Sequence, residues 1–192
     1  MKTSFYDPEE LKSLGLKSYG ENIKISRKAS IYNPEEISLG SNIRIDDFCI
    51  LSGKIDIGSY VHVAAYTALY AQYEPLIIGD FAGLSSRVAI YTFSDDLVWG
   101  TSLGNSTIPD EFKRKVDKGP VVLEKHAMVG SGSVVLPKTK IEIGAVAGAL
   151  SVVRGKLDAW KIYRGNPIKF VSKRPSKRIL ELEEELKKKY PF

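Results

Sequence analysis

The most informative feature of the sequence is an aliphatic residue that recurs at every sixth position. A period of six fits neither an α-helix, whose period is about 3.6, nor a single β-strand, whose period is about 2. It is typical of a solenoid in which short strands and corners alternate, three of each to a triangular coil. A β-sandwich with accidental spacing is the alternative, and fifteen in-phase positions disfavour it: Leu39, Ile45, Leu51, Ile57, Val63, Leu69, Ile78, Leu84, Ile90, Leu123, Val129, Val135, Ile141, Ala147 and Val153.

Each position of the repeat has an expected place in the coil. The aliphatic residue is the first of each group of six and points into the prism. The fifth of the group, small or β-branched as in Cys49 or Thr67, lies near a corner where bulk is penalised. Glycine often follows the aliphatic residue, as in Gly40 and Gly58, and we expect it to supply backbone angles that a Cβ would resist. Successive coils then stack about 4.8 Å apart.

The chain is predicted to be a single domain, residues 1–192, of the all-β solenoid class. Residues 1–22 form an N-terminal helical or capping segment, 23–158 the β-helix, and 159–192 a basic tail with a helix. The coils are 39–56, 57–74, 78–95, 123–140 and 141–158, and the loop 96–122 protrudes between the third and the fourth. A short helix begins after Asp7, and a second begins at Pro175-Ser176. The second helix carries an apolar stripe expected to dock on the prism or on a sister subunit: Ile179, Leu182, Leu186 and Tyr190.

Charge and composition exclude several classes of function. The net charge is +5, but residues 154–192 hold 12 basic and 5 acidic side chains, so the body of the chain is slightly acidic. This disfavours a nucleic-acid-binding surface and leaves a local anion site in the tail possible. No apolar run approaches the roughly 18 residues of a membrane span, and residues 1–10 have no apolar signal core, so we expect a cytoplasmic protein. One cysteine and two histidines predict no disulfide framework and no metal cofactor.

Two stretches near the end of the repeat carry a more specific resemblance. The runs Val129-Gly-Ser-Gly-Ser-Val-Val-Leu-Pro137 and Gly148-Ala-Leu-Ser-Val-Val153, with Tyr163-Arg-Gly-Asn-Pro-Ile-Lys169, are similar to the hexapeptide-repeat acyltransferases. The maltose/galactoside and polysaccharide O-acetyltransferases are the most similar branch. The resemblance implies a left-handed parallel β-helix that forms a homotrimer. It also implies acetyl-CoA in the cleft between neighbouring prisms and transfer of the acetyl group to a sugar hydroxyl or amine.

The sequence departs from this branch at the catalytic position. Members usually carry a histidine where the chain leaves the prism, but here the phrase is Ile90-Tyr-Thr-Phe-Ser-Asp95-Asp96. A carboxylate with a pKa near 4 is a poor general base for a hydroxyl. By the phase of the repeat, His62 lines the acceptor side of the cleft, and we predict that it is the base, paired with the Asp95 of a neighbouring subunit. His126 is the second candidate for the base.

The remaining site predictions follow from the resemblance. Asp96, Tyr91 and Trp99 are expected to contact the acceptor, although turn formation and trimer packing would also explain these residues. The donor would run beside backbone groups of Gly130, Ser131, Ala147 and Ala149, and the first two amides are candidates to hold the thioester oxygen. Four cations are expected to meet the phosphates of CoA: Arg154, Lys169, Lys173 and Arg174.

Other functions compatible with the fold were weighed against acetyl transfer. A catalytically silent trimeric β-helix that serves in binding or assembly is the main alternative, and the missing loop histidine is the evidence for it. A carbonic anhydrase of the γ type would need three zinc-binding imidazoles, which two histidines do not supply within the repeat. The sequence leaves open the identity of the acceptor, the choice between O- and N-acylation, and the length of the acyl group.

Overall fold

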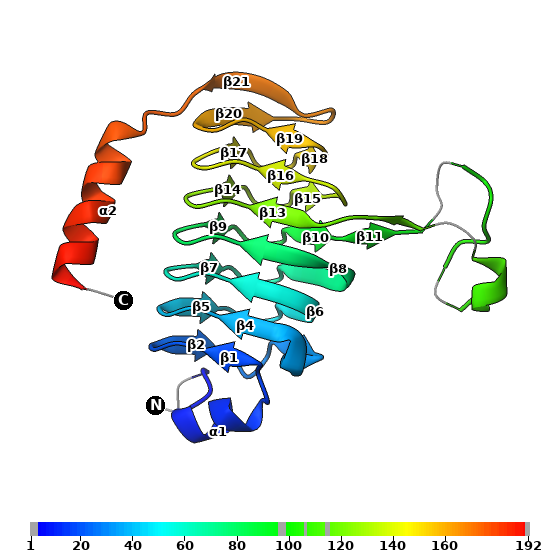
Figure 1. The fold of residues 1–192 in the computed structure, drawn as a ribbon, viewed down its shortest axis with the longest axis horizontal. Coiled ribbons are helices and arrows are strands. Elements are labelled where there is room, and N and C mark those ends of the chain that lie inside the picture. Colours follow the sequence, from blue (N-terminus) through cyan, green and yellow to red (C-terminus); the bar gives the residue numbers. More distant parts are fainter. Residues whose placement is uncertain (1–3, 96–98, 106, 114–115, 191–192) are drawn as a thin grey trace.

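A computed structural model describes residues 4–95, 99–105, 107–113 and 116–190, and its centre is a prism of stacked coils (Figure 1). Nearly all pairing between strands of the prism is parallel and joins one coil to the next. Ile43 lies beside Ile23, for example, and Val63 beside Ile45. The parallel β-helix predicted from the period of six is therefore confirmed.

The strands form three walls. The histidine wall, named after His62, contains β2 (Ile23–Ile25), β5 (Ile43–Ile45), β7 (His62–Val63), β9 (Gly83–Leu84), β14 (Met128–Val129), β17 (Val146–Ala147), β20 (Lys161–Arg164) and the antiparallel β21 (Lys169–Lys173). The tyrosine wall contains β3 (Ser30–Tyr32), the first part of β6 (Ile50–Ile57) and of β8 (Ala68–Ile78), β10 (Ala89–Tyr91), β15 (Val134–Val135) and β18 (Val152–Val153). The back wall contains β1 (Ser18–Tyr19), β4 (Ile37–Leu39), the last part of β6 and β8, β13 (Val121–Leu123), β16 (Lys140–Ile141) and β19 (Lys156–Leu157).

The core of the prism consists of the residues that the repeat places inside. Leu51, Leu69 and Ile90 are fully buried on the tyrosine wall, and Ile45 and Val63 are fully buried on the histidine wall. The small or β-branched fifth residues are buried as well: Cys49, Val61, Thr67, Ala82, Val88, Ala127, Ser133, Thr139, Ala145 and Ser151. Both assignments made from the repeat are confirmed.

The corner glycines serve a different purpose from the one predicted. The residue with a positive φ lies three positions after the aliphatic residue and is often bulky, as in Tyr60 (58°) and Tyr66 (64°). Gly40 and Gly58 have no positive φ, so the prediction that they supply special backbone angles is wrong. Their role is steric, because a Cβ on Gly40 would lie 2.7 Å from the carbonyl carbon of Gly58 in the next coil. Glycine is needed where consecutive coils approach each other most closely.

The pairing between coils begins before Leu39, the residue at which the first predicted coil starts. β1 pairs with β4 and β3 with β6, so Ile25 and Ile31 belong to a coil before Leu39. The 3₁₀ turn η1 (Pro34–Glu36) inserts residues between that coil and the next and breaks the period. The predicted N-terminal helix is confirmed as α1 (Pro8–Ser13), with Asp7 and Glu10 forming a capping box.

The predicted protruding loop leaves the prism as an arm (Figure 1). Its base is an antiparallel pair of β11 (Phe93–Ser94) and β12 (Asp117–Lys118), and its outer part contains the turn η2 (Asp110–Phe112). The buried Asp117 fixes this base to the prism, because its carboxylate accepts hydrogen bonds from Lys138 and Arg154, each at 2.7 Å.

The second predicted helix is α2 (Lys177–Lys189), which stands beside the prism (Figure 1). Its predicted apolar stripe is only partly covered by its own prism, since Ile179 and Leu186 are half-buried whereas Leu182 is 47% and Tyr190 56% exposed. Among its described residues only Glu183 is buried. The helix is therefore attached mainly by ionic contacts. No described helix has the length and apolarity that a membrane crossing requires.

Candidate functional site

A hollow of about 340 Å³ opens on the histidine wall. Outward-facing side chains form a column there, in which Arg44, His62, Gly83 and Met128 occupy successive coils. Gly83 contributes no side chain, so the column has a gap between His62 and Met128. The hollow is lined by His62, Ala64, Gly83, Leu84, Ser85, Ser86, Met128 and Ser131.

His62 has a carboxylate partner inside its own chain. Its Nε2 lies 2.7 Å from Oδ2 of Asp46, and Nε of Arg44 donates to Oδ1 of Asp46, also at 2.7 Å. Burial alone would raise the pKa of Asp46, but the hydrogen bonds from Arg44 and His62 hold this pKa below its ordinary value. An ionised Asp46 accepts a hydrogen bond from Nε2–H of a neutral imidazole, and in this tautomer Nδ1 is free to accept a proton. The predicted carboxylate partner was a neighbour's Asp95; within the chain, Asp46 has this role instead.

Of the two amides expected to hold the thioester oxygen, only one is available. The Gly130 amide donates to the carbonyl of Ala147 at 2.8 Å, as part of the pairing between coils, so within the chain it is already engaged. Ser131 lines the hollow together with His62. In the described part of the chain, no acceptor is recorded for the Ser131 amide. The structure thus brings a candidate base and a candidate oxyanion donor to the same place.

A second pocket, of about 470 Å³, lies where the arm leaves the tyrosine wall. It is lined by Tyr70, Tyr91, Phe93, Ser94, Asp95 and Leu136. The rings of Tyr70 and Tyr91 stack with their centroids 5.1 Å apart, and burial raises the pKa of the Tyr70 hydroxyl. Oδ2 of Asp95 accepts a hydrogen bond from the Asn105 amide at 3.2 Å. Tyr91 and Asp95, both predicted to lie near the acceptor, are therefore in one pocket.

Other acceptor-side predictions lie elsewhere. Trp99 belongs to the arm, is 43% exposed and does not line the Asp95 pocket. Asp96 lies outside the described residues. His62 and Asp95 line separate pockets on different walls, so one chain does not bring them together.

The predicted donor site is partly reproduced by a pocket of about 660 Å³ at the last coils. It contains the predicted Ala149 and Lys169, together with Arg164, Asn166 and Phe170, which the sequence analysis missed. Lys173 lies exposed on the same strand, β21. Ala147 is fully buried in the core, and its carbonyl accepts the hydrogen bond of the Gly130 amide.

Two of the predicted phosphate contacts have other partners. Arg154 donates to Asp117 at 2.7 Å and so holds the arm. Arg174 donates to the carbonyls of His126 and Gly144, at 2.9 and 3.0 Å, and burial lowers its pKa. These two arginines therefore have structural partners in place of the predicted phosphates.

His126, the second candidate for the base, is also part of a structural contact. It is 6% exposed, its Nε2 lies 2.7 Å from Oε2 of Glu183, and its ring stacks on Phe81 at 5.1 Å. It belongs to the attachment of α2 and lines none of the pockets described above, so an acceptor has no evident route to it.

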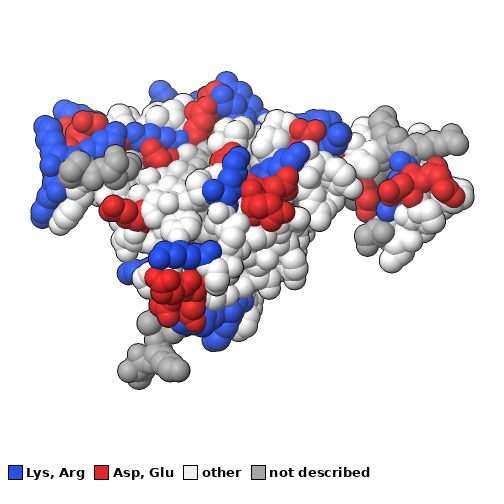
Figure 2. All heavy atoms as spheres, turned by 60° about the horizontal axis from the view of Figure 1, so that its bottom comes forward, with Lys and Arg blue, Asp and Glu red and all other residues white. Residues whose placement is uncertain are grey.

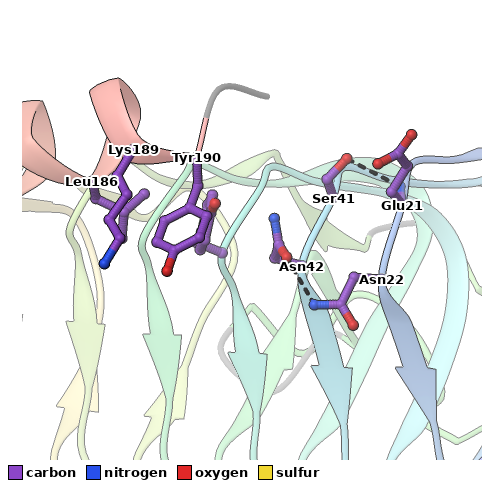
Figure 3. A pocket seen from close by; sticks show the side chains of 8 residues that line it. Glu21, Asn22, Ser41, Asn42, Leu186, Lys189 and Tyr190 are labelled. Carbon is purple, nitrogen blue, oxygen red and sulfur yellow. Dashed lines mark hydrogen bonds between the residues drawn. The ribbon is translucent and has the colours of Figure 1, made fainter.

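A further hollow, of about 790 Å³, lies between the end of α2 and the first coils and contains none of the predicted site residues (Figure 3). Asn22 donates to Asn42 at 2.8 Å on its prism side, and Leu186, Lys189 and Tyr190 form its helix side. Elsewhere on the surface, Figure 2 shows basic and acidic side chains intermixed, with no continuous basic face in this view. Among the described residues, no cluster of three or more His, Cys, Asp or Glu side chains could hold a metal ion.

Comparison with known proteins places this geometry in context. No protein-family model matches the chain. It is 43% identical over 183 residues, 94% of this chain and 93% of the other, to a dTDP-4-amino-4,6-dideoxy-D-glucose acyltransferase of Escherichia coli. A structure of the Bacillus cereus N-acyltransferase AntD with dTDP-4-amino-4,6-dideoxyglucose and coenzyme A matches 98% of this chain and all of that one, with 48% identity and a TM-score of 0.94. AntD with dTDP and 3-hydroxybutyryl-CoA matches 98% of both chains, with 48% identity and a TM-score of 0.91.

Proposed function

Because this chain belongs to the CoA-dependent sugar acyltransferases of the hexapeptide-repeat type, we propose that it acylates the amine of a nucleotide-linked amino sugar. The observation that carries the proposal is the similarity to AntD over the whole length of both chains, in a structure that holds an amino-sugar nucleotide and coenzyme A. The proposed acceptor is therefore dTDP-4-amino-4,6-dideoxyglucose or a close analogue. An acyl-CoA is the donor.

The aspartate found where related O-acetyltransferases have a histidine supports an amine acceptor. A sugar hydroxyl must give up its proton to a base as it attacks, and a carboxylate is too weak a base to assist much. An amine is already a nucleophile in its neutral form, and its ammonium form is attracted by a carboxylate. Asp95, beside the rings of Tyr70 and Tyr91, suits the binding of an ammonium group on a sugar. The departure from the family pattern then reflects a change of acceptor and not a loss of activity.

The His62 hollow supplies the groups that the transfer requires. The ammonium first loses a proton to water, and the neutral nitrogen then attacks the thioester carbon, while the oxygen that becomes negative accepts a hydrogen bond from the Ser131 amide. Nδ1 of His62 takes a proton from the nitrogen and passes it to the departing sulfur, while Asp46 stabilises the imidazolium. The products are the amide and free CoA, and no covalent enzyme intermediate is needed.

We propose a homotrimer, because the two halves of this mechanism lie on different walls of one chain. His62 and Ser131 are on the histidine wall, whereas Asp95 lies at the edge of the tyrosine wall. If the histidine wall of one subunit faces the tyrosine wall of the next, both halves meet at the interface. A cytoplasmic location is proposed as well, since the phosphate-bearing substrates do not cross membranes unaided.

Release of free thiol from acyl-CoA tests the proposal directly. We expect turnover with dTDP-4-amino-4,6-dideoxyglucose and none with dTDP-glucose, which offers only hydroxyls. Asp95→Asn should raise KM for the amino sugar, and His62→Gln should lower kcat. If CoA does not raise the melting temperature and no acyl-CoA is consumed, the silent binding or assembly module is the better description.

A further inference from the structure

The end of the Met128 side chain covers the gap that Gly83 leaves in the outward column of the histidine wall. His62 lies beside Gly83, and Gly83 lies beside Met128, in successive coils about 4.8 Å apart. A Cβ added to Gly83 would meet Cε of Met128 at 2.8 Å and Sδ at 3.0 Å. The end of the Met128 side chain therefore lies directly over the Cα of Gly83. It bounds the hollow on the side opposite His62.

The lining of the hollow combines apolar and polar groups. Ala64, Gly83 and Met128 supply apolar surface, and Ser85, Ser86 and Ser131 supply polar groups beside His62. Such a lining suits a short acyl chain whose carbonyl end is held by hydrogen bonds. The volume of about 340 Å³ leaves room for a chain longer than acetyl. Methionine is unbranched, so the end of the Met128 side chain reaches over Gly83 and closes the hollow on that side.

We propose that Met128 and Gly83 determine the length of the acyl group that the enzyme transfers. This inference rests on the proposed function, because it takes the Ser131 amide as the position of the thioester oxygen. From that position the acyl chain enters the hollow and ends against Met128. The pocket then sets an upper limit on the acyl chain, because a chain that reaches past the hollow collides with Met128.

Donor competition in the full-length enzyme tests the inference. The kcat/KM values for acetyl-, butyryl- and hexanoyl-CoA are measured with saturating amino-sugar nucleotide. One methylene in an apolar pocket changes kcat/KM by roughly 10- to 200-fold, so the wild type should use hexanoyl-CoA at least about tenfold less efficiently than butyryl-CoA. Met128→Ala should raise the hexanoyl-to-butyryl ratio by about tenfold. Gly83→Ala places a methyl group in the gap and should shift the preference toward acetyl-CoA by about the same factor.

Two further variants control for general damage. Met128→Leu keeps the bulk of the side chain and should retain the wild-type ratios. Val146→Ala removes the next outward side chain of the column, which does not line the hollow, and should also leave the ratios unchanged. Comparing ratios between donors cancels any loss of folded enzyme, because all donors are assayed on the same preparation.

The outcomes separate this inference from the proposed function. A wild type that transfers no acyl group from any donor rejects the proposed function. An active wild type whose ratios are the same in Met128→Ala, Gly83→Ala and the controls rejects the inference alone. A change in KM for the amino sugar with unchanged donor ratios also rejects it, because the hollow then holds the acceptor.

Discussion

The attachment of α2 gives the sharpest test of the energetics, through the substitution Glu183→Gln. Glu183 is 5% exposed and is the only buried residue among those described for this helix. Its carboxylate contacts Nε2 of His126 at 2.7 Å, Nζ of Lys187 at 2.5 Å, and Nζ of Lys125. Few apolar contacts assist these ionic ones, so the helix should depend on the charge of one side chain.

The size of the effect follows from the pKa of Glu183. Burial alone would raise this pKa, but hydrogen bonds from Lys125, Lys187 and His126 outweigh burial and lower it from 4.5 to about 2. Each unit of pKa corresponds to about 1.36 kcal/mol, so the ionised carboxylate stabilises the attachment by on the order of 3 kcal/mol. Glutamine removes the charge and leaves cations without a counter-charge, and we expect most of this stabilisation to be lost.

Hydrogen exchange resolves the effect by segment. In Glu183→Gln the amides of α2 should exchange more than tenfold faster, whereas those of the prism should keep their protection, because the core strands do not depend on the helix. Glu184→Gln is the matched control, since the Glu184 carboxylate is exposed and lies 3.9 Å from Lys187. Equal protection of α2 in the wild type and in Glu183→Gln would refute the reasoning.

The same contact predicts a pH dependence of defined sign. The pKa of Glu183 is lower in the folded state than in the unfolded state, so its contribution is fully present above about pH 4.5 and is lost as the pH falls toward about 2. Protection of α2 should therefore decline over that interval in the wild type. In Glu183→Gln, which has no carboxyl group to titrate, this part of the decline should be absent.

The remaining predictions concern the prism and the arm. Gly58→Ala places a Cβ 2.8 Å from the Asp80 amide and should lower the free energy of unfolding by about 1–3 kcal/mol in urea titrations, whereas Gly104→Ala, with nothing within 4 Å, should be near neutral. Leu69→Ala opens a cavity at a fully buried position and should lower the same quantity by about 2–5 kcal/mol; a value below about 1 kcal/mol would contradict the packing of the core. Asp117→Asn should accelerate exchange at the β11–β12 base of the arm. In the wild type, this base should loosen as the pH falls below the ordinary range of an aspartate, because the hydrogen bond from Lys138, ahead of that from Arg154, lowers the pKa of Asp117. Unchanged exchange in Asp117→Asn would show that the arm is held by its backbone pairing alone.

The fold was predictable because its physical constraint repeats. Every wall buries one aliphatic residue per strand, so a single rule is tested many times along the sequence, and chance deviations such as Ala147 do not hide it. The first coil was missed because it contains only Ile25 and Ile31 before the insertion at η1 breaks the period. The role of Gly40 was misjudged for another reason: contact between consecutive coils depends on the distance between backbones, which a sequence pattern does not state.

The candidate site was only partly predictable, because side chains choose partners across coils. His62 was correctly placed on an outward face, but its carboxylate was sought on a neighbouring subunit. Asp46 lies one coil earlier, and the period of the repeat indicates its position. The repeat places Arg44 beside His62 in the neighbouring coil, so the corner that follows Arg44 lies within reach of the imidazole. His126 occupies a different place in the repeat: it lies three positions after Leu123, at a corner with a φ of 60°, whereas His62 directly precedes Val63 on a strand. What the repeat does not show is the carboxylate of Glu183, which a helix far along the chain brings to His126.

The basic tail shows why net charge does not locate an anion site. Of the four cations predicted to meet the phosphates of CoA, Arg154 holds the arm and Arg174 holds backbone carbonyls. Lys169 and Lys173 remain exposed on β21, and Lys169 lines a pocket with Ala149. The Leu150 amide, one residue beyond Ala149, donates to the carbonyl of Ser131, so this pocket and the His62 hollow meet on consecutive coils at one corner. The excess of cations in the tail counts all four side chains alike, so it does not separate the two lysines that remain exposed from the two arginines that have partners within the chain.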